Sequence, residues 1–110
     1  MGISTHILDT SRGRPAQGVA VTLEQQAGAG WKELARGATD ADGRVKPLLA
    51  DIPSEGTFRL SFEVAPYFQR LGVEAFFPRV AIEFLVRAKG EHHHVPLLLN
   101  PFGYSTYRGS

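Results

Sequence analysis

Histidines are the residues of this chain best suited to proton transfer near neutral pH, and three of the four stand together at positions 92–94. Side chains alternate between the two faces of a strand, so His92 and His94 should share one face and His93 the other. His6 falls in the middle of another predicted strand, where an apolar residue is the default. If these two strands are neighbours, His6, His92 and His94 gather on one face of a sheet.

Such a cluster is compatible with three kinds of site. A strand histidine is usually a half-buried residue with an ordinary hydrogen bond, and this structural role stays open for each of them. The imidazoles of His6, His92 and His94 could also ligate Zn²⁺, which takes three or four ligands. Alternatively, a pair of neutral imidazoles could activate a water and later protonate a leaving nitrogen near pH 7.

An arginine beside such histidines would hold an anionic or carbonyl-rich substrate through its planar guanidinium. Arg44, which follows an Asp-Gly turn, and Arg108 are the candidates, although most arginines are solvated surface groups. The last four residues, Tyr107 to Ser110, bring together an aromatic ring, a guanidinium and two hydroxyls. A segment needed only for solubility would not require a phenol next to an arginine, and most chain ends fray. We therefore expect this end to be held in place and to line a site.

The composition limits the class of protein. A length of 110 residues, with 43% hydrophobic residues and seven Phe, is enough for one domain with a real core, which oligomerisation would stabilise. A net charge of +1, with acids and bases interspersed, argues against nucleic acid or an anionic membrane as the main partner. The absence of cysteine excludes disulfides and thiol catalysis. No signal-like or membrane-length apolar run is present, so the cytoplasm is the simplest compartment.

The hydrophobic pattern predicts an all-β fold, a two-sheet antiparallel β-sandwich with one short helix. Alternation is clearest at residues 57–64, and Pro66 and Gly72 favour a short helix at residues 65–71. Pro47 should push its strand to a sheet edge, and Pro96 should cause a bulge or an interrupted ladder. The eight strands are predicted at residues 3–9, 19–24, 31–39, 44–49, 57–64, 79–87, 92–99 and 102–107. Residues 40–43, Asp-Ala-Asp-Gly, predict a tight turn.

Several segments of the sequence carry recognisable signatures. They are residues 4–10 with 13–19, residues 39–44, residues 76–78 with Phe84, and residues 92–110, which finish in Tyr-Arg-Gly-Ser. Together they resemble the transthyretin-like family of 5-hydroxyisourate hydrolases over nearly the whole chain. The sequence departs from the family at His93 and Phe102, where Tyr is usual or common, and at Asn100, where Ser is frequent.

The resemblance implies a single transthyretin-like domain over residues 1–110, in a homotetramer that is a dimer of dimers with sites at the dimer–dimer interface. It implies hydrolysis of 5-hydroxyisourate to 2-oxo-4-hydroxy-4-carboxy-5-ureidoimidazoline in urate degradation, without metal or cofactor. The implied residues are His6, Arg44, His94 and Ser110 as catalytic groups, and Tyr107, Arg108 and Gly109 as substrate-binding groups.

We expect His6 and His94 to orient and deprotonate a water and to return a proton to the departing ring nitrogen. Arg44 would hold the substrate carbonyls and stabilise the developing negative charge. Ser110 would cap the pocket through its hydroxyl or terminal carboxylate, and Tyr107 would shape its wall. The alternative function is a carrier that binds an aromatic small molecule in the inter-dimer channel without catalysis. The polar His6, His94 and Arg-Gly-Ser residues favour the hydrolase.

Overall fold

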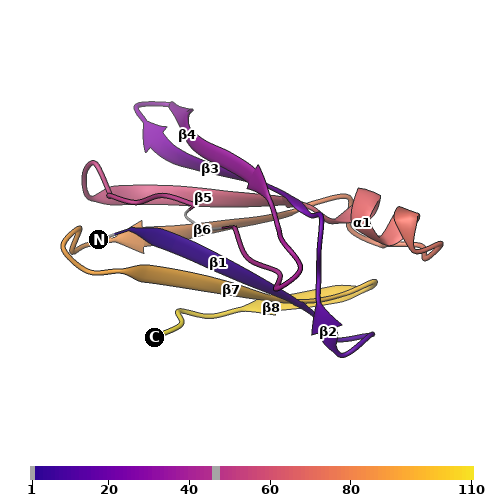
Figure 1. The fold of residues 1–110 in the computed structure, drawn as a ribbon. Helices are drawn as coiled ribbons and strands as arrows, with labels where there is room; N and C mark the ends of the chain where they lie inside the picture. Colours follow the sequence, from indigo (N-terminus) through magenta and orange to yellow (C-terminus); the bar gives the residue numbers. More distant parts are fainter. Residues whose placement is uncertain (1, 46–47) are drawn as a thin grey trace.

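The computed structural model describes residues 2–45 and 48–110 and shows two four-stranded sheets packed into a sandwich (Figure 1). One sheet has the strand order β2-β1-β7-β8 and the other β4-β3-β5-β6. The elements are β1 (Ile3–Asp9), β2 (Arg14–Pro15), β3 (Ala20–Ala27), β4 (Gly30–Ala38), β5 (Gly56–Glu63), α1 (Val64–Arg70), β6 (Val80–Val86), β7 (His93–Asn100) and β8 (Gly103–Thr106). This architecture confirms the predicted all-β sandwich with one short helix.

Two predicted elements differ from the structure. The predicted strand at residues 44–49 is not found among its described residues, 44, 45, 48 and 49, because the second edge of β1 is shared between two segments. The hairpin strand β2 pairs with Leu8 and Asp9, and Arg44 and Leu49 make only isolated bridges to His6 and Ile3. The edge position expected for Pro47 lies outside the described residues. The two-residue β2 was expected to be loop, because two residues are too short to show any alternation.

The prediction of a wholly antiparallel sandwich was wrong in one respect. The central pair β1 and β7 is parallel, with Ile3 opposite His93 and Asp9 opposite Leu99. Parallel neighbours need a long crossover, and here nearly the whole chain separates the two strands. The interrupted ladder expected at Pro96 is confirmed on the β8 side. Pairing with β8 covers residues 97–100, and the next bridge joins His94 to Gly109.

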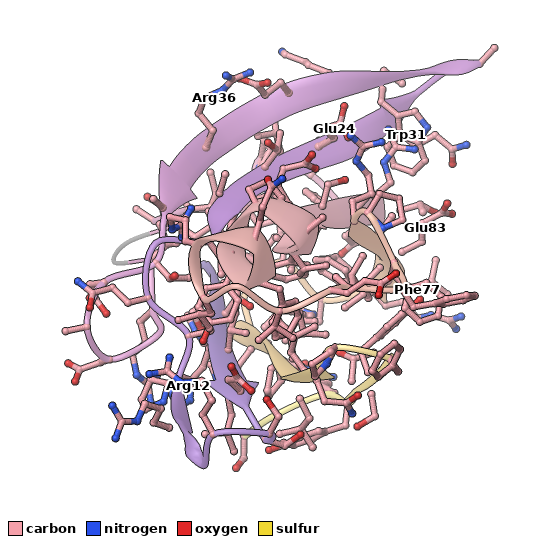
Figure 2. The ribbon with its side chains drawn as sticks, turned by 90° about the vertical axis from the view of Figure 1, so that its right-hand side faces the viewer. Arg12, Glu24, Trp31, Arg36, Phe77 and Glu83 are labelled. Carbon is pink, nitrogen blue, oxygen red and sulfur yellow. The ribbon has the colours of Figure 1, made fainter. Side chains whose placement is uncertain are left out.

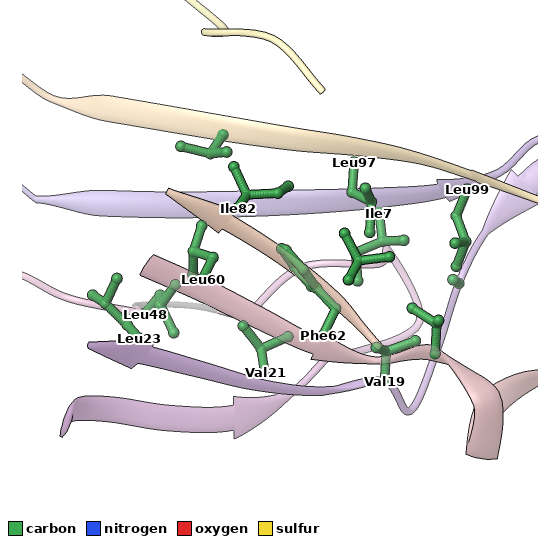
Figure 3. Packing of buried hydrophobic residues seen from close by; sticks show 14 of the residues in the cluster. Ile7, Val19, Val21, Leu23, Leu48, Leu60, Phe62, Ile82, Leu97 and Leu99 are labelled. Atoms are coloured by element: carbon green, nitrogen blue, oxygen red, sulfur yellow. The ribbon is translucent and has the colours of Figure 1, made fainter. Parts of the chain in front are cut away.

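The core fills the space between the two sheets and explains which face of each strand is exposed. Along β1 the burial alternates strictly, with Ile3 and Ile7 buried and Ser4 and His6 only partly buried. The inward side chains of both sheets meet in one cluster, seen in Figure 3, in which Phe62 is fully buried. Ser4 and His6 therefore project from the outer face of the β2-β1-β7-β8 sheet.

Both ends of the chain lie at the end of the sandwich opposite α1 (Figure 1). Helix α1 is tied to the first strand by a buried hydrogen bond of 2.7 Å from the Tyr67 hydroxyl to Asp9 Oδ2. No helix in residues 2–45 or 48–110 is long and apolar enough to cross a membrane.

Candidate active site

The parallel register of β1 and β7 brings the predicted histidines to one outer sheet face. Ser4 lies opposite His94 and His6 opposite Pro96, so all four side chains point to the same side of the sheet. His92, just before β7, reaches the same place through a hydrogen bond to Ser4. The expected gathering of His6, His92 and His94 is therefore found, and the β1–β7 pairing that it required is confirmed.

A tight turn places Arg44 beside His6. Asp40 Oδ1 accepts hydrogen bonds from the backbone N–H groups of Asp42 and Arg44, at 2.9 and 3.1 Å, as in an Asx turn. Gly43 has φ of +75°, and a Cβ atom there would collide with the Ile7 carbonyl oxygen. Only glycine fits this position, because the turn presses against β1. The predicted turn is confirmed, and the residue that follows it, Arg44, bridges to His6.

Ser4 was not predicted as a site residue, but its hydroxyl joins two of the histidines. Ser4 Oγ lies 2.7 Å from His94 Nδ1 and 2.7 Å from His92 Nε2. Its position two residues before His6 on the same strand face was the available sequence signal. One ring nitrogen of each of these histidines is therefore engaged by the serine hydroxyl.

The surroundings of His94 favour its neutral form. Burial lowers the pKa of His94 below its ordinary value, and the charges of Arg44, His6 and His92 lower it further. A hydrogen bond with the Ser4 backbone acts in the opposite direction. No carboxylate forms an ion pair with Arg44 or with these histidines in the part of the chain that the structure describes. A neutral imidazole near the positive charge of Arg44 is suited to accept a proton while negative charge develops nearby.

The C-terminal segment is fixed against β7, as expected. The Gly109 N–H donates a 2.8 Å hydrogen bond to the His94 carbonyl oxygen, and Thr106 Oγ1 donates a 2.7 Å bond to the Pro96 carbonyl oxygen. A Cβ atom on Gly109 would lie 2.5 Å from His94 Cδ2, so a larger residue would displace that ring. Gly109 therefore controls the position of His94 by close backbone approach.

The other tail residues are placed differently. The side chains of Tyr107 and Arg108 line a cavity of about 260 Å³ that also contacts His93 and Ile82, residues of the two inner sheet faces. Arg108 faces Glu91 at 3.5 Å, with both side chains exposed. Ser110 is exposed. The structure thus brings together His6, Arg44, His94 and Gly109, with Tyr107 and Arg108 turned toward the neighbouring cavity.

The zinc alternative finds no support in the geometry. Among residues 2–45 and 48–110, no three His, Cys, Asp or Glu side chains are grouped to hold a metal ion. His92 Nε2 and His94 Nδ1 each lie 2.7 Å from the Ser4 hydroxyl oxygen.

A family model described as the HIUase/Transthyretin family matches residues 3–109. The chain belongs to this family. The resemblance stated from the sequence is thereby confirmed. A 5-hydroxyisourate hydrolase of Salmonella typhimurium is 47% identical over 98% of this chain and 80% of its own length. One from Mus musculus is 41% identical over 98% of this chain and 94% of its own length.

The solved structures that resemble this HIUase/Transthyretin chain include both a 5-hydroxyisourate hydrolase and a transthyretin. The Klebsiella pneumoniae 5-hydroxyisourate hydrolase has a TM-score of 0.86 at 40% identity, covering 99% of this chain and 93% of its own. A sea bream transthyretin solved with thyroxine has a TM-score of 0.92 at 32% identity, covering 97% and 93%. Because the fold is common to both, the side chains of the site must decide between the two functions.

Proposed function

We propose that this chain is a 5-hydroxyisourate hydrolase, which converts 5-hydroxyisourate to 2-oxo-4-hydroxy-4-carboxy-5-ureidoimidazoline in urate degradation. The observation that carries the proposal is the grouping of His6, His94 and Arg44 on one sheet face, with the pKa of His94 lowered. The names and high coverage of the hydrolase relatives support the same conclusion.

The reaction needs a base, an acid and a partner for negative charge, and the site offers all three. His94, neutral because of burial and the nearby positive charges, takes a proton from water as the oxygen attacks the substrate carbonyl. Arg44 stabilises the resulting oxyanion. The C–N bond then breaks, and the departing ring nitrogen takes the proton back from His94. His6 orients the water from the neighbouring strand.

The tail residues act in substrate binding. We assign Gly109 to holding the His94 ring in position through its hydrogen bond and its lack of a side chain. Ser110 closes the pocket through its hydroxyl, Tyr107 forms part of the wall, and Arg108 attracts the anionic substrate. This set of roles predicts that removing residues 107–110 lowers the catalytic rate even if the sandwich stays folded.

The same proposal includes assembly into a homotetramer with sites between dimers. Each subunit is one domain of residues 1–110. Several large apolar side chains lie exposed on or near β8, including Phe102 at 67% and Tyr107 at 58%. Exposed groups of this kind often mark subunit contacts. Light scattering coupled to gel filtration would give the mass, and a monomeric mass would reject the tetramer.

The cytoplasmic location stays a prediction, which cell fractionation would check.

The second candidate function is a carrier for an aromatic small molecule in the inter-dimer channel, because sea bream transthyretin has the same fold. The two functions are separated by one assay. Urate oxidase generates 5-hydroxyisourate in the cuvette, and its decay is followed by ultraviolet absorbance with and without untagged protein. Decay well above the spontaneous rate supports the hydrolase. Decay at the spontaneous rate, together with saturable thyroxine binding, would support the carrier.

A further inference from the structure

The serine hydroxyl between His92 and His94 limits how protons can be arranged in the site. A hydroxyl has one hydrogen to donate and two lone pairs to accept. Ser4 Oγ is 2.7 Å from His94 Nδ1 and 2.7 Å from His92 Nε2, so it can donate to only one of these nitrogens. The protonation of one ring is therefore coupled to that of the other.

Two arrangements of this chain correspond to two roles of His94. If His94 Nδ1–H donates to Ser4 and Ser4 donates to His92, then the neutral His94 carries a lone pair on Nε2 and is a base. If Ser4 instead donates to His94 Nδ1, then His94 carries its hydrogen on Nε2 and is an acid. Once His94 Nε2 has taken a proton from water, moving one proton along each hydrogen bond converts the first arrangement into the second, with the positive charge then on His92.

We propose that Ser4 and His92 form a proton relay that converts His94 from base to acid within one catalytic cycle. This inference rests on the proposed hydrolase function and assigns two further residues to it. His94 contacts the reacting water. Ser4 and His92 act through His94, so they are positioning and proton-storing residues.

The proton transfers balance at each step. His94 Nε2 takes a proton from the attacking water, His94 Nδ1 gives its proton to Ser4 Oγ, and Ser4 gives its own to His92 Nε2. His92 then carries the positive charge, and His94 is neutral with its hydrogen on Nε2. When the ring nitrogen departs, His94 Nε2 protonates it, and the three transfers run in reverse. No proton is gained or lost overall.

The surroundings favour storing the charge on His92. His94 is partly buried and faces the positive or titratable groups Arg44, His6 and His92. The tail segment packed on His94 presents uncharged Gly109, and Arg108 is directed at Glu91. His92 is exposed to solvent, where water stabilises an imidazolium. A positive charge moved from His94 to His92 passes from a partly buried ring to an exposed one.

The test compares Ser4→Ala, which breaks the relay, with Ser4→Thr, which keeps a hydroxyl, and His92→Gln, which cannot take up a proton. Ser61→Ala, a hydroxyl deletion in β5 of the other sheet, is the matched control. We expect Ser4→Ala and His92→Gln to lower kcat on the order of 10- to 100-fold, the range known for removing the hydrogen-bond partners of metal-binding histidines. Ser4→Thr should recover most of the rate, and Ser61→Ala should match the unmodified chain.

The pH profile and the tautomer of His94 distinguish a relay from a merely structural role. Protonation of either His94 or His92 stops the relay, so the acidic limb of kcat against pH should lose one ionisation in His92→Gln. Nitrogen-15 NMR of the substrate-free protein should show the hydrogen of His94 on Nδ1, and Ser4→Ala should mix the tautomers. A His92→Gln variant with unchanged rate and pH profile would overturn the relay. The NMR result is independent of turnover, so failure of the hydrolase assay with the unmodified chain would instead reject the proposed function.

Discussion

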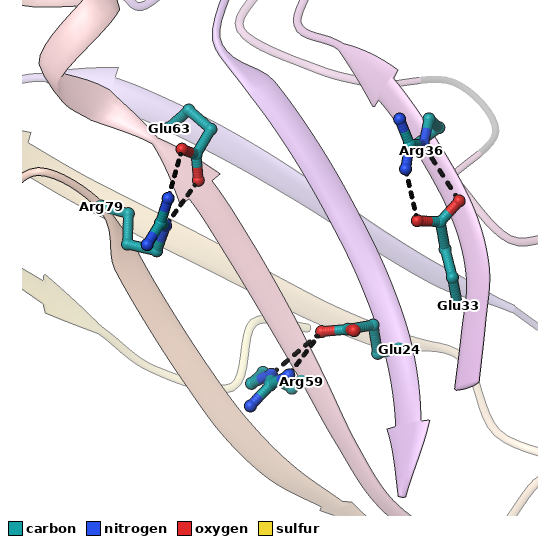
Figure 4. Close-up of polar contacts among 6 residues, drawn as sticks. All are labelled: Glu24, Glu33, Arg36, Arg59, Glu63 and Arg79. Carbon is teal, nitrogen blue, oxygen red and sulfur yellow. Dashed lines mark hydrogen bonds and ion pairs between the residues drawn. The ribbon is translucent and has the colours of Figure 1, made fainter. Parts of the chain in front are cut away.

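The two outer faces of the sandwich differ in whether their charged side chains are paired with opposite charges. On the β4-β3-β5-β6 sheet, arginines are paired with carboxylates, as Figure 4 shows: Arg59 with Glu24 at 2.8 Å, Arg36 with Glu33 at 2.6 Å and Arg79 with Glu63 at 2.9 Å. Arg59 also lies 4.1 Å from the centroid of the Trp31 ring, and Figure 2 shows Glu24 and Trp31 on this side of the molecule. On the β2-β1-β7-β8 sheet, the described residues of the site include imidazoles, a hydroxyl and Arg44, with no carboxylate paired to them.

The difference separates groups that are already satisfied from groups that can act on a substrate. Hydrogen bonding to Arg79 lowers the pKa of Glu63, so the pair stays charged and mutually neutralised. On the other face, burial and positive neighbours lower the pKa of His94, which keeps a basic lone pair available. The same strand alternation builds both faces, so the types of polar residue, and not the fold, determine which face does chemistry.

The largest expected effect follows removal of the imidazole on the catalytic face. His94→Asn should lower kcat/KM for 5-hydroxyisourate by about 10²- to 10⁴-fold, because a general acid–base group is lost. The circular dichroism spectrum should be unchanged, since His94 is only partly buried. Unchanged turnover in this variant would remove His94 from the mechanism.

A substitution in the core between the two sheets should lower the stability of the whole sandwich. Phe62 is fully buried between the sheets, so Phe62→Ala should lower the free energy of unfolding by about 3–5 kcal/mol. Urea denaturation followed by fluorescence measures this change. Val73→Ala, at a side chain that is 39% exposed, is the control and should change it by less than about 0.5 kcal/mol. Equal losses in both variants would contradict the core assignment.

Removing the guanidinium tests the electrostatics of the catalytic face. Arg44→Gln should lower kcat by about 10²- to 10³-fold, the range for loss of an oxyanion donor. Arg44 is one cause of the lowered pKa of His94, so its removal should raise that pKa. The base form then requires a higher pH, and the acidic limb of the kcat/KM profile should move upward. A limb that moves to lower pH would refute the coupling.

The smallest effect is expected on the paired face. Glu24→Gln breaks the ion pair with Arg59. The side chain of Arg59 is 28% exposed and that of Glu24 is 21% exposed, so the substitution should lower the free energy of unfolding by about 1 kcal/mol or less. Turnover should be unchanged, because this face contributes nothing to the reaction. A tenfold fall in kcat would show that the two faces are not functionally separate.

Alternation of side chains was sufficient to predict most of the fold and the gathering of histidines. Ile3–Asp9 was predicted to the residue from a loose alternation in the sequence, and in the structure its burial alternates strictly. The two-residue β2 and the parallel pairing of β1 with β7 were not predictable, because both depend on contacts between distant segments. The same limit applies to the site. Ser4 is an ordinary strand residue in the sequence, and only the register with β7 brings it between His92 and His94.

The most direct test of the central claim is the decay of enzymatically generated 5-hydroxyisourate with a chain that ends at Thr106. Removal of residues 107–110 eliminates Gly109, which holds the backbone of His94, and leaves the paired face untouched. We predict that the full chain accelerates the decay well above the spontaneous rate and that the shortened chain, still folded by circular dichroism, loses most of this acceleration. Full activity in the folded, shortened chain would contradict the assignment of catalysis to the face that this segment closes.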